Sequence, residues 1–184
     1  MIARTSSVVL GIDPGTLMTG YGVVARSGSA LRHIASGTIP NRPGTPIAER
    51  LDTIYSMLVE LIRKHRPDEV AIETAFYGKN AQSALKLGHA RGVSILAAVQ
   101  HQKPLYEYAP REVKKGVVGN GNASKQQVEF MVRTLLHLGS MRIAHDTSDA
   151  LAVAICHLER KPVNTRRHQS WKAYVEAHPE RVKK

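Results

Sequence analysis

The sequence contains very little cysteine and no long hydrophobic run. Its single cysteine, Cys156, excludes an intramolecular disulfide framework. No stretch approaches the roughly 18 apolar residues that a transmembrane helix requires. The first residues, Met1 to Ser7, lack the pattern of a secretory signal peptide. We therefore expect a cytoplasmic protein with no membrane partner.

Acidic residues are also scarce relative to basic ones. The chain of 184 residues carries 15 Asp and Glu against 26 Lys and Arg, a formal net charge of +11. Its length and composition are typical of one globular domain with a real hydrophobic core. Lys and Arg that neutralise phosphates release condensed counterions, so this charge favours nucleic acid as a partner. The alternative is a solvated basic surface that has no specific partner.

Much of the excess charge lies at the end of the chain. Residues 161–184 hold seven Lys and Arg against two Glu, which gives a net charge of +5. Pro162, Asn164 and Thr165 follow directly after the last periodic segment. We expect a folded domain over residues 1–160 and a mobile basic tail over 161–184. Whether this tail contacts DNA or is dispensable stays open.

Hydrophobic periodicity predicts the elements of the domain. Short apolar runs predict strands at Ser7–Asp13, Tyr21–Arg26, Leu31–Ile39, Val70–Glu73 and Leu105–Tyr108, with a hairpin turn at Ser27-Gly28-Ser29. Helical spacing predicts helices at Ile47–Ile62 (N-cap Thr45, first residue Pro46), Asn80–Gln100, Ser124–Leu136 and Thr147–Leu158, the last entered from Asp146. Ser124 and Gln127 form a capping box. This order favours a mixed sheet flanked by helices over an alternating doubly wound sheet.

Four acids occupy positions where chemistry can take place. Asp13 and Glu73 each close a predicted buried strand, and strand ends lie at the rim of a sheet, where sites commonly form. Asp146 and Asp149 are three residues apart at the start of a helix, so they share one face. Each acid also has a structural explanation. The alternatives are a turn of Asp13 with Pro14 and Gly15 and an N-cap role for Asp146.

Carboxylates that gather within a few ångströms raise one another's pKa unless a cation joins them. Mg²⁺ prefers carboxylate oxygens and binds through a few protein ligands, water and phosphate. Two such ions about 3.5–4 Å apart can activate water and stabilise the leaving oxygen in phosphodiester cleavage. An acidic pocket in a basic protein therefore predicts a metal-dependent nuclease that binds DNA.

Several motifs occur in one order along residues 8–158. They are Gly11–Gly15 with Thr19–Gly22, Ile72–Phe76 with Lys79–Ala81, Ser83–Gly88 with Ala90–Gly92, Tyr108–Lys114 with Val117–Gly119, and Asp146–Ala152 with His157. Together they resemble the RuvC family of Holliday junction resolvases. A single short piece such as GIDPG would be weak, whereas five ordered blocks are specific.

The resemblance implies a ribonuclease H-like α/β fold, with a five-stranded mixed sheet flanked by α-helices. It implies a homodimer that depends on Mg²⁺, with Mn²⁺ as an alternative ion and two ions per active site. Such a dimer nicks two opposing strands of a four-way DNA junction symmetrically, during recombination and repair. A branch-migration motor is a further partner that the resemblance implies.

Residue roles also follow from the resemblance. Asp13, Glu73, Asp146 and Asp149 match the catalytic, metal-binding acids, and some members have His at the position of Asp146. Here His145 directly precedes that position, and whether it assists the catalytic acids stays open.

Predicted DNA contacts come from the same matches. Phe76 corresponds to an aromatic residue associated with opening base pairs at the crossover, and an aromatic side chain there can stack on an unpaired base. Lys79 lies in the same loop. Lys114 and Lys125 match basic positions near the site and can stabilise phosphate charge. The alternatives are a core contact for Phe76 and exposed, inert lysines.

Two other functions compete with a nuclease. Gly11–Thr16 also resembles the first phosphate motif of actin-like ATPases, but those proteins need a duplicated domain that this chain is too short to hold. A second alternative is a junction-binding protein with a silent site. The presence of all four acids favours the nuclease over this binder.

Overall fold

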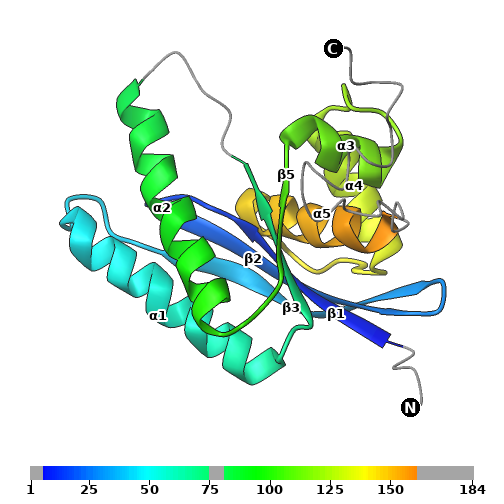
Figure 1. The fold of residues 1–184 in the computed structure, drawn as a ribbon. Coiled ribbons are helices and arrows are strands. Elements are labelled where there is room, and N and C mark those ends of the chain that lie inside the picture. Colours follow the sequence, from blue (N-terminus) through cyan, green and yellow to red (C-terminus); the bar gives the residue numbers. More distant parts are fainter. Residues whose placement is uncertain (1–5, 75–80, 161–184) are drawn as a thin grey trace, which may run out of the picture.

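A mixed five-stranded sheet forms the centre of the computed structural model, which describes residues 6–74 and 81–160 (Figure 1). The strands are β1 (Ser6–Asp13), β2 (Met18–Ser27), β3 (Ala30–Pro40), β4 (Glu69–Glu73) and β5 (Leu105–Tyr108). They lie in the order β3-β2-β1-β4-β5, in which β1, β2 and β3 are antiparallel while β4 and β5 run parallel to β1. The predicted mixed sheet is confirmed.

The β2–β3 hairpin confirms the turn predicted at Gly28. Ser27 pairs with Ala30, so Gly28 and Ser29 alone make the connection. Gly28 adopts φ 60°, in the left-handed region that glycine enters without a steric penalty. Both strands are longer than predicted, because the ladder continues to the pairs Met18–Pro40 and Ser27–Ala30.

Helices cover both faces of the sheet (Figure 1). One face carries α1 (Ile47–His65) and α2 (Ala81–Gln100). The other carries α3 (Pro110–Val118), α4 (Lys125–Leu135) and α5 (His145–Glu159). None of the helices in the described parts of the chain has the length and apolar character needed to span a membrane.

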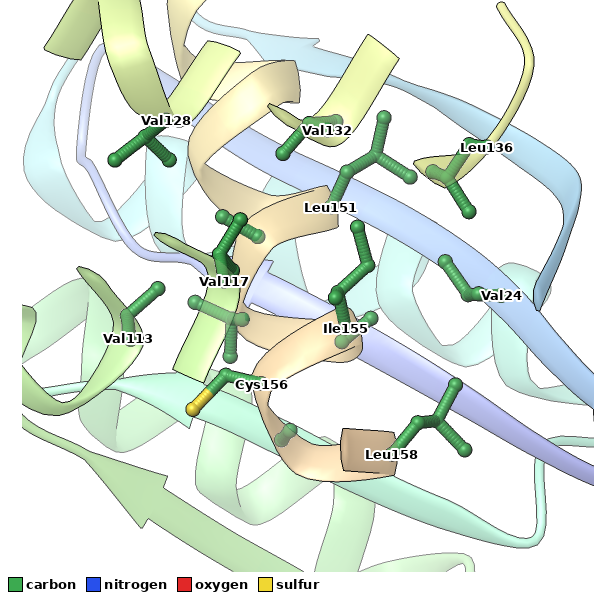
Figure 2. Packing of buried hydrophobic residues seen from close by; sticks show 14 of the residues in the cluster. Val24, Val113, Val117, Val128, Val132, Leu136, Leu151, Ile155, Cys156 and Leu158 are labelled. Carbon is green, nitrogen blue, oxygen red and sulfur yellow. The ribbon is translucent and has the colours of Figure 1, made fainter. Parts of the chain in front are cut away.

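α5 is the central helix of its layer, packed between the sheet and the pair α3 and α4 (Figure 2). Its side chains from Ala150 to Cys156 are all almost completely buried. Leu151 and Ile155 pack with Val24 of β2 and with Val132 of α4 in one apolar cluster. Burial of large aliphatic side chains stabilises a fold by about 1.5–3 kcal/mol each, so this layer fixes α5 firmly on the sheet.

Three predicted details of the helices were wrong. α1 begins at Ile47 with Pro46 at the N-cap and no side-chain capping bond, so Thr45 is not the cap. α5 begins at His145, two residues before the predicted start, with Ala144 at the N-cap. α3 was not predicted at all, because only two of its nine residues are buried and its apolar pattern is short.

Candidate metal-binding active site

Asp13 and Glu73 are brought together by strand pairing. β1 and β4 are adjacent and parallel, and Ile12 pairs with Ile72, so the next residue of each strand is an acid at the same edge of the sheet. Side chains alternate between faces along a strand. Gly11 lies against α5, so Asp13, two residues later, projects on the α5 face as well. Asp13 and Glu73 therefore form the sheet half of an acidic cluster.

α5 contributes the other two acids because glycines let it approach the sheet closely. A Cβ atom at Gly20, which pairs with Asp13 in the β1–β2 ladder, would overlap the backbone carbonyl oxygen of Asp146. A Cβ atom at Gly11 would likewise overlap the carbonyl oxygen of Ala150. The absence of these side chains places the start of α5, with Asp146 and Asp149, over the ends of β1 and β2.

The electrostatics show that these carboxylates interact. Burial first, and then the charges of Glu73, Asp149 and Asp146, raise the pKa of the Asp13 carboxyl to about 8. Burial and the charge of Asp149 raise the pKa of Glu73 to about 7. Without a cation, Asp13 and Glu73 therefore resist full ionisation near neutral pH.

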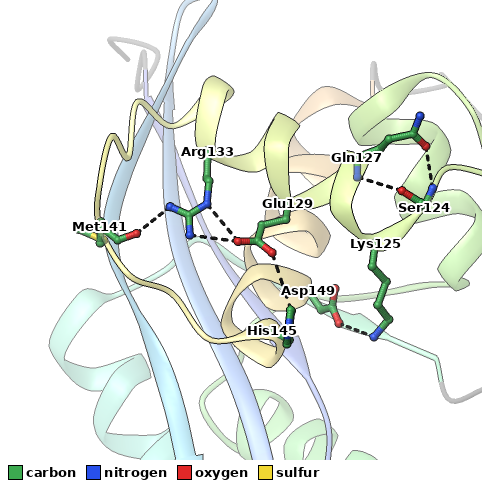
Figure 3. Close-up of polar contacts among 8 residues, drawn as sticks. All are labelled: Ser124, Lys125, Gln127, Glu129, Arg133, Met141, His145 and Asp149. Carbon is green, nitrogen blue, oxygen red and sulfur yellow. Dashed lines mark hydrogen bonds and ion pairs between the residues drawn. The ribbon is translucent and has the colours of Figure 1, made fainter.

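Two lysines oppose this repulsion. Lys125 Nζ lies 3.4 Å from Asp149 Oδ2, and the Asp149 carboxylate raises the pKa of this lysine (Figure 3). Lys125 opens α4 directly after Ser124, whose side chain accepts a hydrogen bond from the Gln127 amide, as the capping box predicted. Lys114 of α3 lies close enough to lower the pKa of Glu73. The site thus combines carboxylates with cationic groups at their border.

The donor set suits a hard divalent cation. All four acids offer carboxylate oxygens, the ligands that Mg²⁺ prefers. Within residues 6–74 and 81–160, no three or more side chains of His, Cys, Asp or Glu are gathered closely enough to hold a metal ion by themselves. Mg²⁺ sites commonly use one or two carboxylates and complete the shell with water and substrate phosphate, so an open arrangement fits this ion.

Not every predicted residue can be placed relative to the four acids. Phe76 and Lys79 are outside the described residues, as is the basic tail 161–184. The side chain of His145 is 84% exposed, and the contact that it makes is with Glu129 of α4 rather than with the four acids. Cys156 is buried, as expected for a structural residue.

Two residues near the site, Glu129 and Arg133, were not predicted. Glu129 and Arg133 form an ion pair on α4 whose contacts reach the segment leading into α5 (Figure 3). Their i,i+4 spacing on a predicted helix, acid before base, was the available signal.

Comparison with known proteins decides the family. The family model described as crossover junction endodeoxyribonuclease RuvC matches residues 9–157. The chain belongs to this family. A RuvC of Syntrophotalea carbinolica is 53% identical over 149 residues, 81% of this chain and 92% of the relative. A RuvC of Pelotomaculum thermopropionicum is 48% identical over 150 residues, 82% of this chain and 92% of the relative.

Solved structures agree with this assignment. The RuvC of T. thermophilus in complex with a Holliday junction substrate is 36% identical to this RuvC-family chain, with a TM-score of 0.79. The match covers 83% of this chain and 93% of that protein. The yeast mitochondrial Holliday junction resolvase Ydc2, at 15% identity and a TM-score of 0.59, shares the fold. The predicted ribonuclease H-like architecture is confirmed.

Proposed function

We propose that this chain resolves four-way DNA junctions by metal-dependent nicking of two opposing strands. The observation that carries the proposal is the convergence of four carboxylates on one face of the sheet of a strongly basic protein. Burial, and after it their mutual repulsion, raises the pKa of both Asp13 and Glu73, which supports a site that accepts cations. The junction complex of the T. thermophilus relative supports a four-way substrate.

Asp13, Glu73, Asp146 and Asp149 are the residues that would hold Mg²⁺, or Mn²⁺ in its place, with two ions per site. Bound there, such ions supply Lewis-acid stabilisation of the attacking and leaving oxygens of a phosphodiester. Carboxylates at strand ends and on a packed helix stay oriented while DNA approaches, because the core beneath α5 fixes their backbones. Rigid placement is the part of catalysis that the chain itself provides.

Lys114 and Lys125 border the acids, where their charges can bind the phosphate that is being cut. Phe76 and Lys79 follow Glu73 in the sequence, and we assign them to the DNA strands at the crossover. The basic segment 161–184 is assigned as an arm outside the nuclease domain of residues 1–160. Because the substrate is chromosomal DNA, we place the protein in the cytoplasm, where a branch-migration motor is a further partner.

Symmetric cutting requires two active sites, and α2 offers a surface for a second copy. Leu85, Leu96 and Val99 are 62%, 47% and 58% exposed. Gly88 and Gly92 lie between them, and within the described residues no atom outside the adjoining helix backbone stands within 4 Å of a Cβ added at either position. This spacing forms one apolar seam along the helix with room for close approach of a partner helix. We propose a homodimer about this seam, which leaves the acids on the opposite face of the sheet.

The deciding experiment is incubation of the full chain with a synthetic four-way junction and Mg²⁺, beside a linear duplex of matched sequence. We expect paired nicks in opposing strands of the junction, no comparable cutting of the duplex, and no cutting in chelator. Mn²⁺ and Ca²⁺ arms define the metal requirement. An intact junction across varied ions and sequences would overturn the nuclease proposal, and binding without cutting would indicate the silent junction binder.

A further inference from the structure

The segment that leads into α5 is held to the core at Leu138 and Ile143, but its residues nearest the helix are less well supported. Between the end of α4 and the start of α5, Met141 is 46% exposed and Ala144 is also exposed. Ala144 is the N-cap of α5 and makes no side-chain capping bond. A helix start without a capping side chain leaves amides unsatisfied and frays easily. Asp146 lies in this first turn, so the backbone that carries a candidate metal ligand begins without a capping side chain.

Two residues of α4, Glu129 and Arg133, contact the segment that leads into α5 (Figure 3). Arg133 donates from Nε and Nη2 to Glu129 Oε1 at 3.1 and 3.0 Å, and from Nη1 to the Met141 carbonyl oxygen at 2.7 Å. The second carboxylate oxygen of Glu129 lies 3.8 Å from His145 Nδ1. One guanidinium and one carboxylate therefore connect α4 to the segment at both Met141 and His145.

The Glu129–Arg133 pair has the features of a fixed support. The side chains of Glu129 and Arg133 are each 28% exposed, so both are largely shielded from solvent. The planar guanidinium presents fixed donors to the Glu129 carboxylate and to the Met141 carbonyl at the same time, whereas a lysine ammonium is a flexible point charge without that fixed geometry. On the sheet side, the backbone of Asp146 rests against Gly20. The first turn of α5 is thus confined between the sheet and the Glu129–Arg133 pair.

We infer that Glu129 and Arg133 are positioning residues that hold the first turn of α5, and with it Asp146, in the geometry needed to bind the catalytic cation. The inference rests on the proposed function, because it assigns these residues to the same metal site. Neither residue touches the reacting atoms. Their effect is exerted on cation affinity, as for the outer residues that orient metal ligands in other proteins.

The test is Glu129→Ala in the full chain. Loss of an outer support typically weakens metal affinity or activity by about 10- to 100-fold. We expect Mn²⁺ binding to the protein alone, followed by the electron paramagnetic resonance signal of the free ion, to weaken by about tenfold or more. The Mg²⁺ concentration for half-maximal junction cleavage should rise similarly, while metal-free junction binding stays unchanged. Glu129→Gln keeps an oxygen acceptor for Arg133 and should restore most of the affinity.

Glu112→Ala is the matched control. It removes an ion pair between Glu112 of α3 and Arg160, which caps the opposite end of α5. Both variants should lower the melting temperature, but only Glu129→Ala should weaken Mn²⁺ binding. Arg133→Lys gives a second reading if Glu129→Ala fails to fold, since it keeps the charge and loses the double contact.

The outcomes separate the two proposals. Equal Mn²⁺ affinity for Glu129→Ala, Glu112→Ala and the unmodified chain would overturn the positioning role. An unmodified chain that leaves the junction intact would overturn the proposed function, and the Mn²⁺ titration would still decide the positioning role. The positioning role is supported if Mn²⁺ binding is weakened in Glu129→Ala and Arg133→Lys and recovered in Glu129→Gln.

Discussion

Asp13 is a carboxylate whose ionised form is strongly disfavoured by the fold. It lies at the end of a buried strand, and three other carboxylates act on it. Lys125 is the cation that acts in the opposite direction, and its side chain is 74% exposed. An exposed ammonium is well solvated and screened, so it compensates a buried carboxylate only in part. The need for a further cation is therefore concentrated at Asp13.

We expect Asp13→Asn to abolish junction cleavage while leaving junction binding intact. The substitution keeps the size of the side chain and removes a metal-binding oxygen, so the loss of rate should exceed the roughly 100-fold that outer residues of metal sites cost. Single-turnover cleavage and gel-shift binding in chelator measure the two effects. Loss of binding together with cleavage would instead make Asp13 a structural residue.

Asp13 and Glu73 make the free energy of unfolding of the metal-free protein depend on pH. Folded-state pKa values of about 8 for Asp13 and about 7 for Glu73 lie above the ordinary values of 3.8 and 4.5. The folded protein therefore binds more protons than the unfolded chain between these limits, and stability falls as pH rises from about 4 to about 8.

Denaturation in chelator across this range should show that decline, and saturating Mg²⁺ should reduce it. Asp13→Asn removes part of the repulsion, so it should stabilise the metal-free protein at pH 8 by about 1 kcal/mol, equivalent to about one pKa unit. A pH slope that is unchanged in this variant would contradict the electrostatic origin of the decline.

The acids of the site could be predicted from sequence because each follows a local pattern. Asp13 and Glu73 end apolar runs, and Asp146 and Asp149 share a helix face. The contact of Lys125 with Asp149 could not be predicted in the same way, since it joins residues 24 positions apart through the packing of α4 on α5. Glu129 and His145 also meet only through that packing.

At the scale of elements, the approach of α5 to the sheet depends on Gly20. We expect Gly20→Ala to destabilise the fold by about 1–3 kcal/mol, the usual cost of forcing extra atoms into a packed interior. Cleavage should fall as well, because the methyl group displaces the backbone of Asp146. Thermal denaturation and the junction assay measure the two effects. A variant with the melting temperature and cleavage rate of the unmodified chain would show that α5 can shift without consequence.

Elements with strong local signals were predicted well. The capping box placed the start of α4 correctly, because Ser124 and Gln127 satisfy its first amides without help from the rest of the fold. α3 has a weaker signal, Pro110 at its first residue and Glu112, whose carboxylate accepts a hydrogen bond from the Ala109 amide, and the start of α5 has no capping side chain. Ala109 and Ala144 stand at their N-caps, and alanine has no side-chain acceptor to mark a boundary. Tertiary packing determines those boundaries.

At the scale of the whole molecule, the proposed dimer predicts that Leu96→Glu yields monomers. A charge in the apolar seam of α2 would be buried without a partner, which is costly. Analytical ultracentrifugation should detect the change, and junction cleavage should lose its paired character. Phe130→Glu is the control, because Phe130 is 68% exposed on α4, in the other helical layer. A dimer that survives Leu96→Glu would place the partner on another surface.

The two helical layers pack on opposite faces of one sheet, through two separate apolar clusters. The four acids and their lysines lie on the side of the sheet that α3, α4 and α5 cover, while the α2 seam belongs to the other side. On the proposed dimer, assembly and chemistry therefore depend on opposite sides of the sheet. A grafted α1–α2 layer could change how copies associate, or tether a new partner, without rebuilding the cutting site. The sheet thus makes the molecule a two-part scaffold for protein engineering.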